Sequence, residues 1–243
     1  MSEIPLASLL NLFETLIALL CALFIWIRKR SAIFNNPLVV RFFICFTLSA
    51  VTFFIFSTPG LIVRDLLVMQ LVYTFGDVCV LLTNIYLVFI PIKIYSKNSK
   101  IATVITRFIF VFAAFYLIHN LITLSPVTVV RFGPFIDWRG STNPLLQTID
   151  SAIAGLCLLS AAILFFNQGW KHKDMIVKKR SRFFGSGFLL VLLGWISIFV
   201  FTASSGSSLT IILAGSAIGN TFISIGLVLL LVGVFTQEKS PVL

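Results

Sequence analysis

The sequence predicts an all-α integral membrane protein: a bundle of seven transmembrane helices, with the N-terminus outside and the C-terminus in the cytoplasm. Three observations support this fold class. Hydrophobic residues make up 59% of the 243-residue chain and charged residues only 11%, against roughly 25% charged residues in soluble proteins. The apolar residues gather into seven runs, and the positive charges gather at alternate connections between the runs. That alternation is the positive-inside pattern of membrane proteins.

Each apolar run is long enough to cross a bilayer, because the ~30 Å hydrocarbon core takes about 20 helical residues. We place the runs at residues 4–27, 38–58, 66–90, 101–124, 146–168, 183–203 and 209–235. The connections are short, so residues 1–243 are expected to form a single seven-helix transmembrane domain without a soluble module. The predicted location is a plasma or inner membrane, crossed several times.

Basic residues mark the first, third and fifth connections as cytoplasmic. These connections hold or adjoin Arg28, Lys29, Arg30 and Arg41, then Lys93, Lys97, Lys100 and Arg107, then the basic segment at residues 170–182. Only Arg64, Arg131 and Arg139 fall on the other side. Because the formal charge of +10 follows the predicted topology, we do not expect nucleic-acid binding. The basic connections are instead expected to attract anionic membrane lipids.

The first run carries an acid within an otherwise apolar helix. Ser8, Asn11 and Thr15 share a stripe with small residues, which favours close packing between helices, and Glu14 lies beside that stripe. The second run, after Pro37, is rich in phenylalanine and offers almost no chemistry.

The third run carries an acid near its centre. At ~100° per residue, one narrow stripe contains Gln70, Tyr73, Thr74, Asp77, Leu81 and Asn84. A carboxyl group facing lipid is costly, so the stripe should face other helices or a wet cavity, and Asp77 is a candidate site. The alternative is a protonated Asp77 that only hydrogen-bonds a neighbouring helix. Glu14 lies at a similar predicted depth, which indicates a shared pocket. We expect the helix to end at Pro91.

The fourth and fifth runs add polar groups near the outer surface. His119 is either a structural hydrogen-bonding group or a titratable base close to the acids. The loop at residues 125–144 is the longest outer connection, and we expect either a lid or an interfacial anchor. Asp150 follows about one turn into the fifth run, where it can cap the helix or face the outer cavity.

The fifth connection, at residues 170–182, is the most basic part of the chain. It is expected to fix the topology and to dock anionic lipid or an acidic cytoplasmic partner through Lys171, Lys173, Lys178, Lys179, Arg180 and Arg182. The last two runs should pack as an antiparallel hairpin. In the seventh run Gly215, Gly219, Gly226 and Gly233 share one face suited to packing, while Asn220 lies on the other side, where it can line a cavity.

No motif of an enzyme or a cofactor site is recognised in the sequence. HExxH, GxSxG, a Walker loop and the dinucleotide fingerprint are missing. We therefore expect no catalytic site and no cofactor, although an enzyme could still use Glu14, Asp77 and His119. The two histidines lie on opposite predicted sides of the membrane, so we expect neither bis-His haem ligation nor a multi-His metal site. Cys21, Cys45, Cys79 and Cys157 all lie inside apolar runs, and we expect no disulfide.

Rhodopsins and G-protein-coupled receptors share the seven-helix layout but not the motifs. The seventh run has neither a lysine nor NPxxY, and the third ends in Asn84-Ile85-Tyr86-Leu87 rather than an acid-Arg motif. Short loops, a basic first connection, the Gln70 to Tyr73 stretch and the basic exit after the third run give a layout that resembles the membrane sensor region of bacterial histidine kinases and diguanylate cyclases. The resemblance implies a sensor whose members normally continue into a signalling domain.

Three functions remain open from the sequence. The first is a stand-alone sensor or receptor-like module that binds a small molecule or lipid from the outer side and signals through its cytoplasmic loops to a protein partner. Its candidate ligand-binding or proton-binding residues are Glu14, Asp77, Asn84, His119, Asp150 and Asn220. The second is a small secondary transporter or proton-coupled carrier that loads protons or cations at Asp77 and Glu14. The third is a structural or assembly subunit of a membrane complex.

Overall fold

The structure, a computed structural model, describes residues 4–95, 99–140, 142–203 and 209–236. Within these ranges, seven helices are long and apolar enough to cross a membrane. This finding confirms a helical bundle of a multi-pass membrane protein. The helices are α1 (Leu6–Asn35), α2 (Pro37–Ser57), α3 (Leu66–Tyr95), α4 (Ser99–Ile122), α5 (Pro144–Lys171), α6 (Met175–Ala203) and α7 (Leu209–Phe235).

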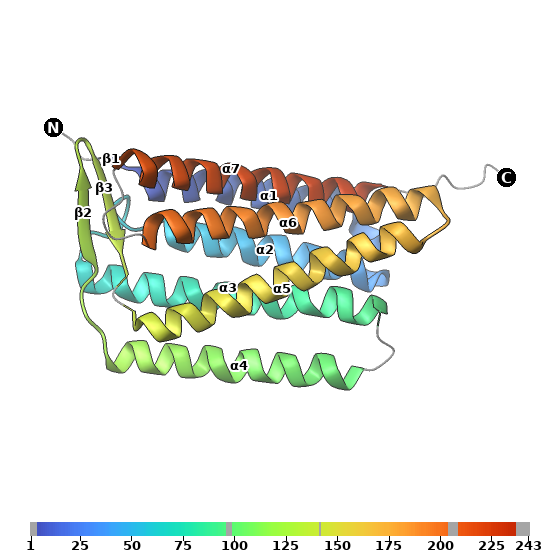
Figure 1. The fold of residues 1–243 in the computed structure, drawn as a ribbon, viewed down its shortest axis with the longest axis horizontal. Helices are drawn as coiled ribbons and strands as arrows, with labels where there is room; N and C mark the ends of the chain where they lie inside the picture. Colours follow the sequence, from blue (N-terminus) through green and yellow to red (C-terminus); the bar gives the residue numbers. More distant parts are fainter. Residues whose placement is uncertain (1–3, 96–98, 141, 204–208, 237–243) are drawn as a thin grey trace.

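Six of the helices close into a ring. Along this ring α1 packs on α2, α2 on α3, α3 on α5, α5 on α6, α6 on α7, and α7 back on α1. The remaining helix, α4, packs against α3 at the edge of the bundle (Figure 1). Because α2 lies between them, α1 and α3 are not neighbours in the ring. Glu14 on α1 and Asp77 on α3 therefore come from helices that do not pack side by side.

A small sheet covers one end of the bundle, which we call the sheet end (Figure 1). It consists of β1 (Ile4–Pro5), β2 (Thr128–Phe132) and β3 (Phe135–Arg139), in the order β1-β3-β2. The opposite end holds the connection between α5 and α6, and we call it the basic end. The all-α fold class therefore needs one addition, because the predicted outer loop contains an antiparallel hairpin rather than irregular chain.

The hairpin follows from its own residues. β-Branched and aromatic residues, which favour strands, flank a two-residue turn at Gly133 and Pro134, and Phe132 pairs with Phe135 across it. Gly133 has a φ of 58°, which glycine adopts readily at the first turn position of a tight hairpin. Below the turn, Trp138 and Ile136 pack with Met69 of α3, so the sheet is anchored on the bundle.

Two kinds of contact hold the helices together: stacked aromatic rings and close approaches at glycines. In the half nearer the basic end, Phe42 of α2 stacks on Phe184 of α6 with ring centroids 4.6 Å apart, so the phenylalanine-rich second run supplies the core. Along α6 and α7, glycines face each other at two levels. A Cβ on Gly194 would lie 2.5 Å from the carbonyl oxygen of Gly219, and a Cβ on Gly187 would lie 2.9 Å from that of Gly226. The predicted glycine face of the seventh helix is therefore its contact with α6.

Three helix ends differ from the sequence prediction. The first helix continues to Asn35 with a break at Lys29, whose backbone angles are not helical. The third continues through Pro91, because a transmembrane helix tolerates proline where neighbouring groups satisfy the freed backbone. The predicted basic loop is short, since only residues 172–174 connect α5 to α6. The loop prediction was therefore wrong for four basic residues that lie in the first turns of α6: Lys178, Lys179, Arg180 and Arg182.

Candidate functional site

Three helices bring two carboxyl groups together in the half of the bundle nearer the sheet. The hydroxyl of Tyr116 on α4 donates a hydrogen bond of 2.5 Å to Oδ2 of Asp77 on α3. Asp150 on α5 lies close enough to Asp77 for their carboxyl groups to interact electrostatically. A side-chain hydrogen bond also joins Tyr116 to Thr142, just before α5. We call Asp77, Tyr116 and Asp150 the acidic cluster.

Asp77 lies on the polar stripe of α3, and this stripe packs against other helices. Gln70, Thr74 and Asn84 of that stripe are all buried, as the sequence predicted. Neighbouring Gly76 permits a close approach, because a Cβ there would lie 2.4 Å from the ring of Phe56 on α2. The stripe thus faces helices on both sides, and its acid reaches α4 and α5.

The acidic cluster has no counter-charge in the part of the chain that the structure describes. No basic side chain contributes to the electrostatics of Asp77 or Asp150 there, and Oδ1 of Asp150 is buried without a hydrogen-bond partner. Two neighbouring carboxylates repel each other and are costly to bury. The site can be neutralised by a shared proton or by a bound cation. Among the described residues, no group of three or more His, Cys, Asp or Glu side chains could hold a metal ion.

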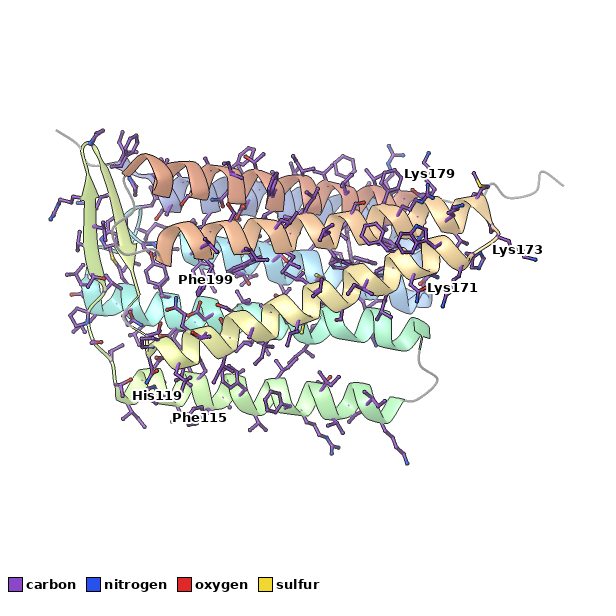
Figure 2. All side chains as sticks on the ribbon, viewed as in Figure 1. Phe115, His119, Lys171, Lys173, Lys179 and Phe199 are labelled. Carbon is purple, nitrogen blue, oxygen red and sulfur yellow. The ribbon has the colours of Figure 1, made fainter. Side chains whose placement is uncertain are left out.

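A cavity of about 290 Å³ lies beside the acidic cluster, between α5 and α6 with Val80 of α3 at its back. Asp150 lines it together with Thr148 and Ser151, and Trp195 and Phe199 of α6 supply aromatic walls. Figure 2 shows Phe199 on α6 toward the sheet end. Phe199 is exposed, as are Ala152 and Ile196 on the same cavity wall. The cavity therefore opens sideways, between α5 and α6.

A second, smaller cavity of about 60 Å³ lies deeper in the bundle. Its polar lining comes from Ser49, Thr52, Thr83 and Asn84. Asn84 is only 3% exposed, and its Nδ2 has no hydrogen-bond partner among the described residues. A polar space of this size has room for water. The two cavities share three lining residues: Val80, Ala154 and Trp195.

Glu14 and Asn220 form a separate pair of polar positions across the α1–α7 contact. Both helices run from the sheet end to the basic end, with Sγ of Cys21 at 4.0 Å from the carbonyl oxygen of Leu227. The same seven-residue step back along each helix places Glu14 at the level of Asn220. Glu14 is 1% exposed, and neither of its oxygens has a described hydrogen-bond partner. Asn220 donates from Nδ2 to its own helix, at Ser216 O, over 2.7 Å.

His119 has only local contacts among those that the structure describes. It lies near the end of α4 beside Phe115 (Figure 2), with ring centroids 6.0 Å apart, and Thr123 Oγ1 lies 3.4 Å from its Nδ1. The neighbouring Asn120 is buried, and its Nδ2 has no hydrogen-bond partner among the residues that the structure describes. The structure therefore divides the predicted pocket. Asp77 and Asp150 come together, whereas Glu14 and Asn220 lie at the α1–α7 contact and Asn84 lines the second cavity. None of the described contacts of His119 is with the acids.

Sequence reasoning missed Tyr116, the residue that links α4 to Asp77. A signal was present, since Tyr116, His119 and Asn120 follow the i, i+3, i+4 spacing of one helix face. A buried tyrosine hydroxyl usually finds a hydrogen-bond partner.

The predicted docking residues lie at the basic end, where Figure 2 shows Lys171, Lys173 and Lys179. Lys171, Lys173, Lys179 and Arg182 are exposed, whereas Lys178 and Arg180 are half-buried. The guanidinium of Arg180 lies over the ring of Phe184 at 5.6 Å. Lys171 ends α5, Lys173 lies in the three-residue connection, and the other four residues lie in the first turns of α6, so most of this basic surface is helical rather than loop.

The sequence matches no protein-family model, and no curated protein matches it. The resemblance to bacterial sensor regions therefore stays a prediction, and function has to be argued from the residues.

Proposed function

We propose that the chain is a receptor-like membrane sensor that binds a small organic cation beside the acidic cluster. The observation that carries the proposal is the adjacent pair of intramembrane carboxyl groups, Asp77 and Asp150, which has no described cationic partner. A positive ligand would remove the repulsion between them and offset the cost of burying a negative charge. Ionisable residues inside a membrane mark functional sites by default. The positive-inside pattern predicts that the sheet end faces outward.

The cavity favours an organic cation over a bare ion. Its polar groups are few, and Trp195 and Phe199 offer aromatic faces to which a cation is attracted. A volume of 290 Å³ lies near the lower limit of about 300 Å³ for ligand pockets, so the ligand is small. The sideways opening suits a molecule whose apolar part partitions into the membrane.

A signal would leave the site through α5. Asp150 is on α5, and residues 172–174 join that helix directly to the basic first turns of α6. A bound cation would draw the carboxyl groups of Asp77 and Asp150 together and so change how α3 packs on α5. This shift alters the surface at the basic end, provided that the ligand binds one of the two arrangements more tightly.

The test is thermal stability in detergent at constant pH, with two cations compared with neutral molecules of the same shape. Choline is paired with 3,3-dimethylbutan-1-ol, and n-butylammonium with butan-1-ol. At least one cation should stabilise the parent more than its neutral counterpart, by about 2.7 kcal/mol at 100 times its Kd. The effect should disappear in Asp77→Asn and in Asp150→Asn.

The matched control is Asp65→Asn. Asp65 is exposed and its carboxylate accepts hydrogen bonds from the backbone N–H groups of Leu67 and Val68, a capping role that asparagine keeps. The variant should respond to the cations like the parent. If neither cation exceeds its neutral counterpart in the parent, or if Asp150→Asn keeps the response, the proposal is wrong.

A specific observation favours a second candidate, a carrier for the same class of cation. The lining residues that the two cavities share, Val80, Ala154 and Trp195, mark a route from the acidic cluster toward the middle of the bundle. Proteoliposomes separate the two functions. Uptake of radiolabelled choline that is lost in Asp150→Asn would make the chain a carrier, whereas binding without uptake supports the sensor.

A further inference from the structure

A groove of about 620 Å³ runs between α1 and α7 at the basic end, far from the acidic cluster. Its deeper walls are apolar: Phe24 of α1 with Leu231 and Val232 of α7. Its end is polar, because Arg28 and Lys29 lie at the last positions of the membrane span of α1. The groove thus changes from apolar to basic along its length.

Positive charge concentrates at the polar end of the groove. Arg28 is exposed. Nζ of Lys29 lies 6.0 Å from the centroid of the Phe235 ring, and Lys29 also interacts electrostatically with Arg180 of α6, a like charge. The only acid that the structure describes at the basic end is Asp174, whose Oδ1 accepts a hydrogen bond from the backbone N–H of Ile176. The described residues therefore supply no anion for the groove.

The backbone keeps both basic residues at the edge of the apolar span. At Lys29 the regular helix is interrupted, with φ −126° and ψ 22°. The apolar part of α7 ends at the same level, at Phe235. A bilayer that covers the apolar spans would place the two charges where phospholipid headgroups meet the hydrocarbon layer, and Phe24 and Leu231 at the depth of acyl chains.

We propose that this groove is a binding site for one anionic phospholipid. The phosphate lies at Arg28 and Lys29, and an acyl chain lies along Phe24, Leu231 and Val232. A headgroup with net negative charge complements the two cations, whereas a zwitterionic headgroup carries its own positive charge. The phosphate also offsets the repulsion between Lys29 and Arg180, so the lipid joins α1, α7 and α6. The lipid site shares no residue with the acidic cluster or with the cavity beside it.

Native mass spectrometry of the delipidated protein tests the site. Dioleoyl phosphatidylglycerol is compared with dioleoyl phosphatidylcholine, which has the same acyl chains. The double variant Arg28→Gln, Lys29→Gln should bind phosphatidylglycerol about 25-fold more weakly, at about fivefold for each charge near the membrane surface. The matched control is Lys171→Gln, Lys173→Gln, which removes two exposed charges at the same end. These exposed lysines attract anionic headgroups only diffusely, so the control should weaken phosphatidylglycerol binding much less than the groove variant does.

A third variant tests the apolar half of the groove without changing charge. Val232 is exposed, so Val232→Trp is expected to fold and to fill the path of the acyl chain. It should lose phosphatidylglycerol binding, and glycerol 3-phosphate should not compete in the parent. Equal losses in the two charge variants would show diffuse attraction and overturn the proposal. Unchanged binding in Val232→Trp, or displacement by glycerol 3-phosphate, would also overturn it.

Discussion

Replacing Tyr116 by phenylalanine tests whether the acidic cluster holds the helices together. The ring of Tyr116 is fully buried, at 0% exposure, and the ring of a phenylalanine would fill the same space. The substitution removes only the hydroxyl, which donates to Asp77 Oδ2 over 2.5 Å and forms a side-chain hydrogen bond with Thr142. Any change in stability therefore comes from these two hydrogen bonds and not from a cavity.

The expected loss of stability comes from the buried polar groups that remain without a partner when the hydroxyl is removed. Removing one partner of a buried hydrogen bond costs about 1–3 kcal/mol, because the remaining polar group loses its solvation without compensation. Asp77 has no described basic partner to replace the hydroxyl. We expect Tyr116→Phe to lower the free energy of unfolding by about 1–3 kcal/mol.

The assay is equilibrium unfolding in mixed micelles of dodecyl maltoside and sodium dodecyl sulfate at constant pH. The parent, Tyr116→Phe, Asp77→Asn and the double variant form a cycle, and the coupling energy should fall in the range of about 0.5–3 kcal/mol for groups in contact. Tyr86→Phe is the control, because Tyr86 is an exposed tyrosine on α3 that, among the described residues, interacts only with Arg41 at the basic end, and an exposed interaction of this kind contributes at most about 1 kcal/mol. Additive single effects would refute the view that this hydrogen bond carries energy.

Three further predictions use the same unfolding assay or hydrogen exchange. Gly194→Ala should destabilise by about 1–3 kcal/mol through overpacking, because its Cβ would lie 2.5 Å from Gly219 O. The control is Gly155→Ala, whose Cβ would meet only Leu192 Cδ1 at 3.8 Å, and equal losses would contradict the packing argument. Glu14→Met should stabilise by about 1–3 kcal/mol, since it removes a buried carboxyl group whose oxygens have no described partner. A loss of stability would instead show that Glu14 has a polar partner in the membrane. Gly133→Ala should speed amide exchange in the hairpin at a cost of about 1–2 kcal/mol, because its φ is 58° and no atom lies within 4 Å of the added Cβ. Unchanged exchange would show that the turn does not depend on glycine.

Helix number and the buried face of α3 could be predicted because the bilayer dictates both. Its thickness fixes the length of each apolar run, and the cost of a carboxyl group in lipid fixes the direction that Asp77 faces. Which helices meet that face is a different question. The neighbours of Asp77 are Tyr116, at the far end of the next helix, and Asp150, a helix further on. Periodicity within one helix carries no information on such partners.

Two local errors have physical causes. The basic segment after Lys171 was predicted as a loop because hydropathy falls where charges begin, yet lysine and arginine are good helix formers and α6 already starts at Met175. The hairpin at Gly133 was missed because the segment was read by composition. The β-branched and aromatic residues on both sides of a two-residue Gly-Pro turn are a strand signal that composition alone does not reveal.

Both proposed sites involve α6, and this shared helix makes a last prediction. Trp195 of α6 lines the cavity beside the acidic cluster, and Arg180 of α6 interacts with Lys29 in the lipid groove. Close glycine contacts tie α6 to α7 between these levels, so the two helices should shift as one body.

Phosphatidylglycerol should therefore change the choline affinity, and choline should change the phosphatidylglycerol affinity by the same factor, because coupling between two binding equilibria is reciprocal. Coupling energies are typically about 1–3 kcal/mol, or roughly 5–150-fold in affinity. The measurement is choline affinity in nanodiscs of phosphatidylcholine with and without phosphatidylglycerol, for the parent and for Arg28→Gln, Lys29→Gln. If phosphatidylglycerol leaves the choline affinity of the parent unchanged, α6 and α7 do not couple the two binding sites.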